Sequence, residues 1–148
     1  MKIKSVIKDK RGIDLQFGSI FSTILIITFI VFGFYAITKF LDLQKTIQIE
    51  TFFKDIQGNI DDMWKSTQGS REVEYRLPDT IVAVCFRDDE FENLQFTSEK
   101  IIRGKKINNI DIEKTLGNSD SLCIPNVEGK VKMTLVKNFG EVLVTIKK

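Results

Sequence analysis

Residues 15–38 form an uninterrupted apolar stretch that constrains the fold more than any other part of the chain. The segment reads LQFGSIFSTILIITFIVFGFYAIT and contains no charged residue and no proline. A helix of this length extends about 36 Å, enough to cross a hydrocarbon core of about 30 Å with some tilt. Inside lipid, one isolated segment satisfies its backbone hydrogen bonds only as a helix. The stretch predicts a single transmembrane helix. The alternative is a buried helix of a soluble domain, which so short a chain could hardly surround.

Charge is unevenly distributed along the 148 residues. Residues 1–12 hold five basic residues against one acidic residue, whereas the chain from Lys39 onward holds 17 basic and 18 acidic residues. Because short basic flanks stay on the cytoplasmic side, we expect residues 1–14 to form a cytoplasmic head and residues 39–148 to lie outside the cell membrane. The outer region lacks the basic excess that nucleic-acid binding requires, so no nucleic-acid partner is expected.

A helical pattern continues beyond the span over residues 39–66, where apolar residues recur at helical spacings with charged residues between them. This apolar stripe consists of Leu43, Ile47, Phe53, Ile56, Ile60 and Met63. The adjacent Trp64 is expected to be a core residue that anchors a sheet against the helix. The stripe needs cover, either from the rest of the chain or from the same stripe on another copy.

The pattern changes to short alternating runs beyond residue 70, which predicts an α+β fold: a long helix followed by a small, mainly antiparallel β-domain over residues 71–148. We expect strands at residues 72–77, 81–86, 93–97, 122–124, 130–136 and 141–146, with a helical turn at 112–116. Residues 81–86 are apolar on both faces, which is typical of an interior strand. The last two strands are expected to form a hairpin with Val142, Val144 and Ile146 on one face.

Cys85 and Cys123 both fall in the expected outer region. In an oxidising compartment, two such residues favour a disulfide, and closing a loop of about 38 residues would contribute about 3–4 kcal/mol. The alternative is two separately buried free cysteines.

Candidate catalytic and metal-binding groups are few. The sequence contains no histidine, which removes the commonest general base and transition-metal ligand. Two cysteines cannot complete a structural zinc site. The acidic run Asp88, Asp89, Glu90 and Glu92 lacks the frame of an EF-hand and is expected to be a solvated loop. We therefore expect no metal, no cofactor and no enzymatic activity.

The sequence Lys10-Arg11-Gly12 before Ile13, followed by the span, the amphipathic continuation and the β-domain, resembles type IV pilin-like proteins, most closely the archaeal ones with class III signal peptides. The resemblance implies that a prepilin-type peptidase removes residues 1–12 by cutting between Gly12 and Ile13. It also implies that the mature helix packs with copies of itself or related subunits in a cell-surface filament.

Two features depart from this family pattern. Many bacterial pilins carry a glutamate five residues into the mature chain, where this sequence has Phe17, and the Ser-Pro of many archaeal pilins is missing. Asp14 is the nearest acidic residue; its position alone indicates an N-terminal cap of the helix.

Together these features predict a structural protein of the cell surface, anchored by residues 15–38 and displaying the β-domain. Its assembly would rest on Asp14, on Trp64 and on the apolar stripe. The alternative is an uncleaved single-pass membrane protein whose outer domain binds a protein partner or belongs to a membrane complex. Cleavage after Gly12 distinguishes the two.

Overall fold

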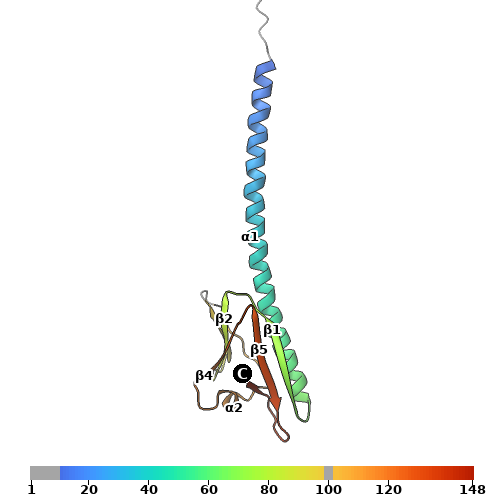
Figure 1. The fold of residues 1–148 in the computed structure, drawn as a ribbon, viewed down its shortest axis with the longest axis vertical. Helices are drawn as coiled ribbons and strands as arrows, with labels where there is room; N and C mark the ends of the chain where they lie inside the picture. Colours follow the sequence, from blue (N-terminus) through green and yellow to red (C-terminus); the bar gives the residue numbers. More distant parts are fainter. Residues whose placement is uncertain (1–10, 99–101) are drawn as a thin grey trace, which may run out of the picture. The chain divides into compact units, whose positions relative to one another are not determined.

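The computed structural model describes residues 11–98 and 102–148, and the side chains of residues 18–98 and 102–148. The chain divides into two units, with the boundary between Leu43 and Gln44. Helix α1 (Arg11–Lys65) contributes to both units (Figure 1). The second unit adds two three-stranded sheets and a short helix. The predicted α+β class, a long N-terminal helix followed by small antiparallel sheets, is confirmed.

Helix α1 is 55 residues long and ends close to the predicted position. The segment is free of proline, so no missing backbone donor interrupts its hydrogen-bond ladder. Ser66, the first residue after the helix, turns back on it: its backbone N–H donates to the Met63 carbonyl over 3.1 Å, and its hydroxyl donates to the same carbonyl over 2.6 Å.

The first sheet consists of β1 (Gly69–Arg76), β5 (Lys130–Lys137) and β6 (Thr145–Lys147) in the order β1-β5-β6, with all pairs antiparallel. β1 and β5 lie side by side over their whole length (Figure 1). Their inner faces follow the predicted alternation of apolar residues, which places Val73, Tyr75, Val131, Met133 and Leu135 in the core.

The second sheet consists of β2 (Ile81–Arg87), β3 (Leu94–Ser98) and β4 (Ser121–Pro125) in the order β3-β2-β4, again antiparallel. β2 is the predicted interior strand. Its register with β3 shifts between Ile81 and Ala83. Val82 is exposed, whereas Ile81 and Val84 are buried, although these two are three positions apart. The extra residue at the irregularity shifts the alternation of inward and outward side chains by one position.

Short contacts close the outer edges of β6 and β3. Helix α2 (Ile112–Leu116) begins at the N-cap Asp111, and its Thr115 hydroxyl accepts the backbone N–H of Ile146 over 3.0 Å. At the other sheet, Leu94 of β3 exchanges both backbone hydrogen bonds with Lys105, over 3.1 and 3.0 Å. Unpaired strand edges invite association with other chains, so these contacts restrict where a partner strand could add.

The core of the second unit lies between the C-terminal part of α1 and the two sheets. Phe52 occupies its centre, with its ring edge-on to Tyr75 at 5.2 Å and tilted against Phe96 at 5.7 Å between centroids. Geometries of this kind add to the stabilisation from burial alone. The largest fully buried side chains of the core are Phe52, Ile56, Ile60, Ile81, Val84, Phe86, Leu94, Ile124, Val131, Met133, Leu135 and Ile146.

The predicted C-terminal hairpin is partly wrong. β6 begins only at Thr145, so residues 138–144 form a loop longer than the expected four-residue turn. Val142 is exposed, although Val144 and Ile146 are buried as expected. Val144 instead forms a parallel bridge with Ile110, donating to Asn109 and accepting from Asp111. That remote partner takes the place of the neighbouring strand.

Candidate functional site

The first candidate surface is the apolar part of α1 in the first unit. From Ile20 to Leu41 its large side chains are exposed on every side of the helix: Ile20, Phe21, Ile24, Leu25, Ile26, Ile27, Phe29, Ile30, Val31, Phe32, Phe34, Tyr35, Ile37, Phe40 and Leu41. The hydroxyls of Thr23 and Thr28 donate to carbonyls one turn earlier in the helix, so these polar groups are satisfied internally. The helix therefore offers a uniformly apolar surface to its surroundings.

This segment is long and apolar enough to cross a membrane, and none of it is buried within the described chain. A helix that is apolar all round belongs in a large protein core or in lipid. The described residues provide no such core around it. The alternative of a buried helix in a soluble domain therefore finds no support, and the architecture fits a membrane-anchored protein.

The residues expected to form a cleavage junction lie at the start of the described helix. Gly12, Ile13 and Asp14 are all within α1, and their side chains lie outside the described set. Asp14 lies within the described part of the helix, and its expected role in capping or assembly stays a prediction. Residues 1–10 lie outside the described residues.

Within the described chain the amphipathic stripe is buried from Phe53 onward, and cover of its exposed first part by another copy stays a prediction. Phe53, Ile56, Ile60 and Met63 are buried as expected, with Ile49 partly buried beside them. Leu43 and Ile47 are 56% and 54% exposed, because the sheets cover the helix only beyond them. Trp64 is 40% exposed and is not the expected core anchor. Phe52, which the predicted stripe omitted, fills that role.

The predicted disulfide joins Cys85 and Cys123. The two residues face each other in register on β2 and β4, with their Cα atoms 4.1 Å apart. Cys85 is buried, whereas Cys123 is exposed. The alternative of two free cysteines is excluded, and the bond fixes two adjacent strands whose pairing spans five residues.

The acidic loop, defined here as residues 88–92, is internally organised. The Asp89 carboxylate accepts the backbone N–H groups of Phe91 and Glu92 over 2.8 and 2.9 Å, and these hydrogen bonds hold its pKa below the ordinary value. Phe91 projects from the centre of the loop and is 78% exposed. Within residues 11–98 and 102–148, no three acidic or cysteine side chains are grouped to hold a metal ion.

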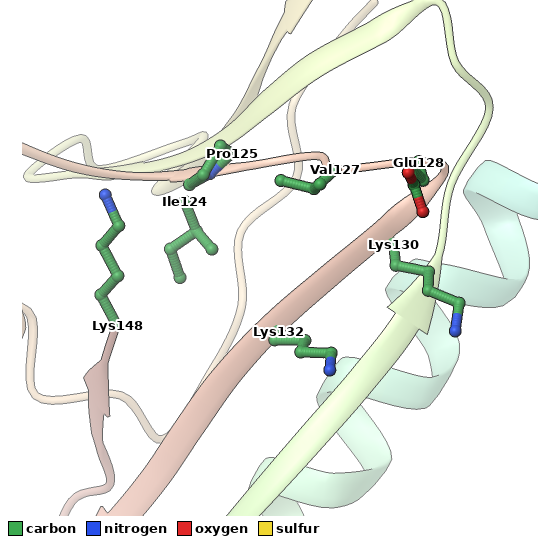
Figure 2. A pocket seen from close by; sticks show the side chains of 7 residues that line it. All are labelled: Ile124, Pro125, Val127, Glu128, Lys130, Lys132 and Lys148. Atoms are coloured by element: carbon green, nitrogen blue, oxygen red, sulfur yellow. The ribbon is translucent and has the colours of Figure 1, made fainter.

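The second unit also carries a cleft of about 460 Å³, which we call the lysine cleft. It is lined by Ile124, Pro125, Val127, Glu128, Lys130, Lys132 and Lys148 (Figure 2). Figure 2 shows Lys148 on one side of Ile124, while Lys130 and Lys132 lie on β5 on the other side, with their side chains directed toward the neighbouring strand β1. The cleft therefore combines an apolar floor with a basic rim. Six of its seven lining residues fall within residues 124–132, and only Lys148 comes from another part of the chain; sequence analysis did not single out this pattern.

The turn beside this cleft has a defined backbone conformation. Val127 and Lys130 exchange both backbone hydrogen bonds, at 2.9 and 3.0 Å. The two residues between them, Glu128 and Gly129, have φ values of 53° and 74°. Positive φ at both central positions is the signature of a type I′ turn, which presents Glu128 and Val127 to solvent at the mouth of the cleft.

None of the protein-family models, curated proteins or solved structures compared with the chain matches it. The architecture of the chain, an N-terminal apolar helix followed by a small antiparallel β-domain, is compatible with a pilin-like fold.

Proposed function

We propose that this chain is a pilin-like structural subunit of the cell surface, anchored in the membrane by the apolar part of α1 and displaying the disulfide-closed β-domain. One observation carries the proposal: between Ile20 and Leu41 the helix exposes large apolar side chains on all of its sides. A membrane anchor needs such a surface, and a helix that leaves the bilayer to join an assembly needs neighbours of the same kind to cover it.

The second unit supports a display role more than a catalytic one. Its described residues bring no histidine and no grouped metal ligands together. Its structure depends instead on a hydrophobic core and a cross-strand disulfide. Small domains outside the reducing cytoplasm use such bonds to supplement a limited core. We therefore propose a non-enzymatic function, with copies of the chain or related subunits and a prepilin-type peptidase as partners.

The orientation belongs to the same proposal. The basic residues of the head favour a cytoplasmic N-terminus, which places the second unit outside. Removal of residues 1–12 on the cytoplasmic side would then free the helix from its charged head. Without this step the helix would remain in the bilayer, because the charged head resists transfer through lipid.

The intact mass of the protein purified from its native membrane tests this proposal. A mass lacking residues 1–12 is the expected result, since the peptidase would cut between Gly12 and Ile13. A full-length chain would contradict the pilin-like function and leave an uncleaved single-pass anchor with an outer binding domain. A Gly12→Val variant is the matched control: it should retain residues 1–12 if the junction is the peptidase site.

A further inference from the structure

The acidic loop presents a single large apolar side chain surrounded by negative charge. Phe91 lies between Asp88, Asp89 and Glu90 on one side and Glu92 on the other. The backbone N–H of Arg87 donates to the Asn93 carbonyl over 3.0 Å, which closes the base of the loop. Together with the two hydrogen bonds to Asp89, this contact fixes the loop, so Phe91 is presented in an ordered setting.

The lysine cleft has the complementary character. Its floor is made by Ile124, Pro125 and Val127, which are apolar, and its rim carries three lysines and one glutamate. Glu74 forms ion pairs with Lys130 and Lys132 over 3.0 and 3.3 Å, and it neutralises only part of this charge. The rim therefore keeps a positive excess around an apolar floor. A volume of about 460 Å³ falls in the range of pockets that enclose small ligands, so it has room for one aromatic ring.

The loop and the cleft lie at opposite ends of the same strand pair. In the β2–β4 register, Arg87 faces Ser121 next to the acidic loop, whereas Ala83 faces Pro125 next to the lysine cleft. The four intervening steps separate these ends by about 13 Å. Because the loop is closed at its base, it cannot reach the cleft of its own chain. Each copy thus carries the two complementary surfaces facing different neighbours.

We propose that the acidic loop of one copy docks into the lysine cleft of a second copy, with Phe91 seated on the apolar floor and the loop carboxylates facing the lysine rim. The inference rests on the proposed assembly of copies and names the contact between their outer domains. Such a contact is heterologous, since different patches meet, and it repeats from copy to copy to give a ring or an open filament, depending on the rotation between copies. The paired signs of charge select this partner and orient the approach.

The proposed contact is small, so it is too weak to hold two copies together by itself. One aromatic side chain and its loop bury less surface than a stable isolated protein–protein interface requires. Copies already held together through their helices present loop and cleft at a high effective concentration, so a weak contact becomes occupied. The docking therefore sets the register between neighbouring domains, while the helices supply the association.

Site-directed cross-linking of the full chain in its native membrane tests the contact. A Glu90→Cys/Glu128→Cys chain places one thiol in the acidic loop and one at the mouth of the lysine cleft. Both substitutions leave Phe91 and the apolar floor of the cleft intact. Treatment with a short bismaleimide, which spares the Cys85–Cys123 disulfide, should yield a ladder of cross-linked oligomers. Each single cysteine variant alone should yield none. An Ala36→Cys chain separately reports packing between the apolar helices.

The decisive comparison uses two equally exposed phenylalanines. Phe91 and Phe139 are both 78% exposed, so replacing either should leave the core intact. Phe91→Ala in the double-cysteine chain should lower the ladder about tenfold, as expected when a central anchor is lost. Phe139→Ala should leave it unchanged. A ladder indifferent to Phe91→Ala would reflect random collision and would overturn the contact.

The remaining outcomes separate the contact from the proposed function. Cross-linking through Ala36→Cys without any Glu90–Glu128 product would overturn the docking and leave the helix-based assembly standing. A Glu90–Glu128 ladder without Ala36 cross-links would support the docking and contradict assembly through the helices. Absence of both products would overturn both.

Discussion

The Lys137 Nζ atom lies 2.8 Å from the carbonyl oxygen of Ser66, the first residue after α1. The same ammonium group also donates to the carbonyl oxygen of Trp64. The last carbonyls of a helix lack partners within the helix and carry its negative dipole end. Lys137 lies at the end of β5 and is only 8% exposed. It therefore caps the C-terminal end of α1, although it stands 71 residues after Ser66 in the sequence.

Replacing this lysine should destabilise the second unit. Lys137→Met keeps the aliphatic stem and leaves the two carbonyls without their donor, so we expect the free energy of unfolding to fall by about 1–3 kcal/mol. Denaturant unfolding followed by Trp64 fluorescence would measure it. Lys130→Met on the same strand is the control, because it removes only an exposed ion pair with Glu74 and should cost less than about 1 kcal/mol. Equal losses in the two variants would contradict the capping role.

Two isoleucines on α1 provide a matched test of where the domain begins to cover the helix. Ile60 is fully buried, whereas Ile47 is 54% exposed. Ile60→Ala should lower the free energy of unfolding by about 2–5 kcal/mol through lost burial and a cavity. Ile47→Ala should change it by less than about 0.5 kcal/mol in the isolated chain. If Ile47→Ala lowered the free energy of unfolding more than Ile60→Ala, the sheets would not cover the face of α1 that carries Ile60.

The type I′ turn predicts substitutions of opposite sign at neighbouring positions. Glu128→Asn should raise stability by about 0.5–1 kcal/mol, because asparagine tolerates positive φ better than glutamate does. Gly129→Ala should lower it by about 1–2 kcal/mol, since a Cβ there is strained and would lie 3.3 Å from the Leu77 carbonyl oxygen. Thermal unfolding of the two variants and of the unchanged chain measures both changes in stability. Changes of the same sign in the two variants would refute the turn geometry.

Tyr75 predicts a stability change at alkaline pH. Burial raises its pKa to about 12, opposed in part by the Asn59 side chain, which donates to the phenol oxygen over 3.0 Å. Since the ordinary value is about 10, the folded state favours the neutral phenol. Its contribution to stability is complete below pH 10 and is lost as the pH rises toward 12. Absorbance titration of a Tyr35→Phe chain, whose single tyrosine is Tyr75, should show ionisation near pH 12 when folded and near pH 10 in denaturant. Ionisation near pH 10 in the folded chain would contradict the buried phenol.

The disulfide should account for a large share of the stability of the second unit. A Cys85→Ala/Cys123→Ala chain restores the freedom of a 38-residue loop in the unfolded state, so the free energy of unfolding should fall by about 4 kcal/mol. Intact mass before and after reduction, with a gain of about two mass units, confirms the bond in the natural protein. No gain would mean that the bond is absent from the protein in its membrane.

Local patterns in the sequence were sufficient to predict the elements of this fold. The alternation of Val73, Tyr75 and Leu77 predicted a half-buried strand, and all three side chains face the core. The two cysteines fall on runs with strand-like residues, and the register of β2 and β4 brings them together. These predictions succeed because period and composition are properties of neighbouring residues.

Features that depend on distant partners were beyond the sequence. The burial of α1 starts at Ile49 and Phe52 rather than at Leu43, since its onset depends on where the sheets end and not on the helix's own pattern. Val144 leaves the expected hairpin because residues 109–111 supply its hydrogen bonds. The lysine cleft adds Lys148 to six residues of the segment 124–132, and only the fold brings Lys148 beside that segment.

The position of the disulfide has a mechanical consequence. Cys85 and Cys123 are the middle pair of the β2–β4 register, between the end that carries Phe91 and the end that borders the cleft. If neighbouring copies pull on these two ends, the force acts along the strands and shears one against the other. Hydrogen bonds alone would share this load and would give way together once the force exceeded their combined strength. A covalent bond at the midpoint transmits the tension between the strands and keeps the domain from extending, so a row of these domains would resist stretching as far as its non-covalent contacts hold.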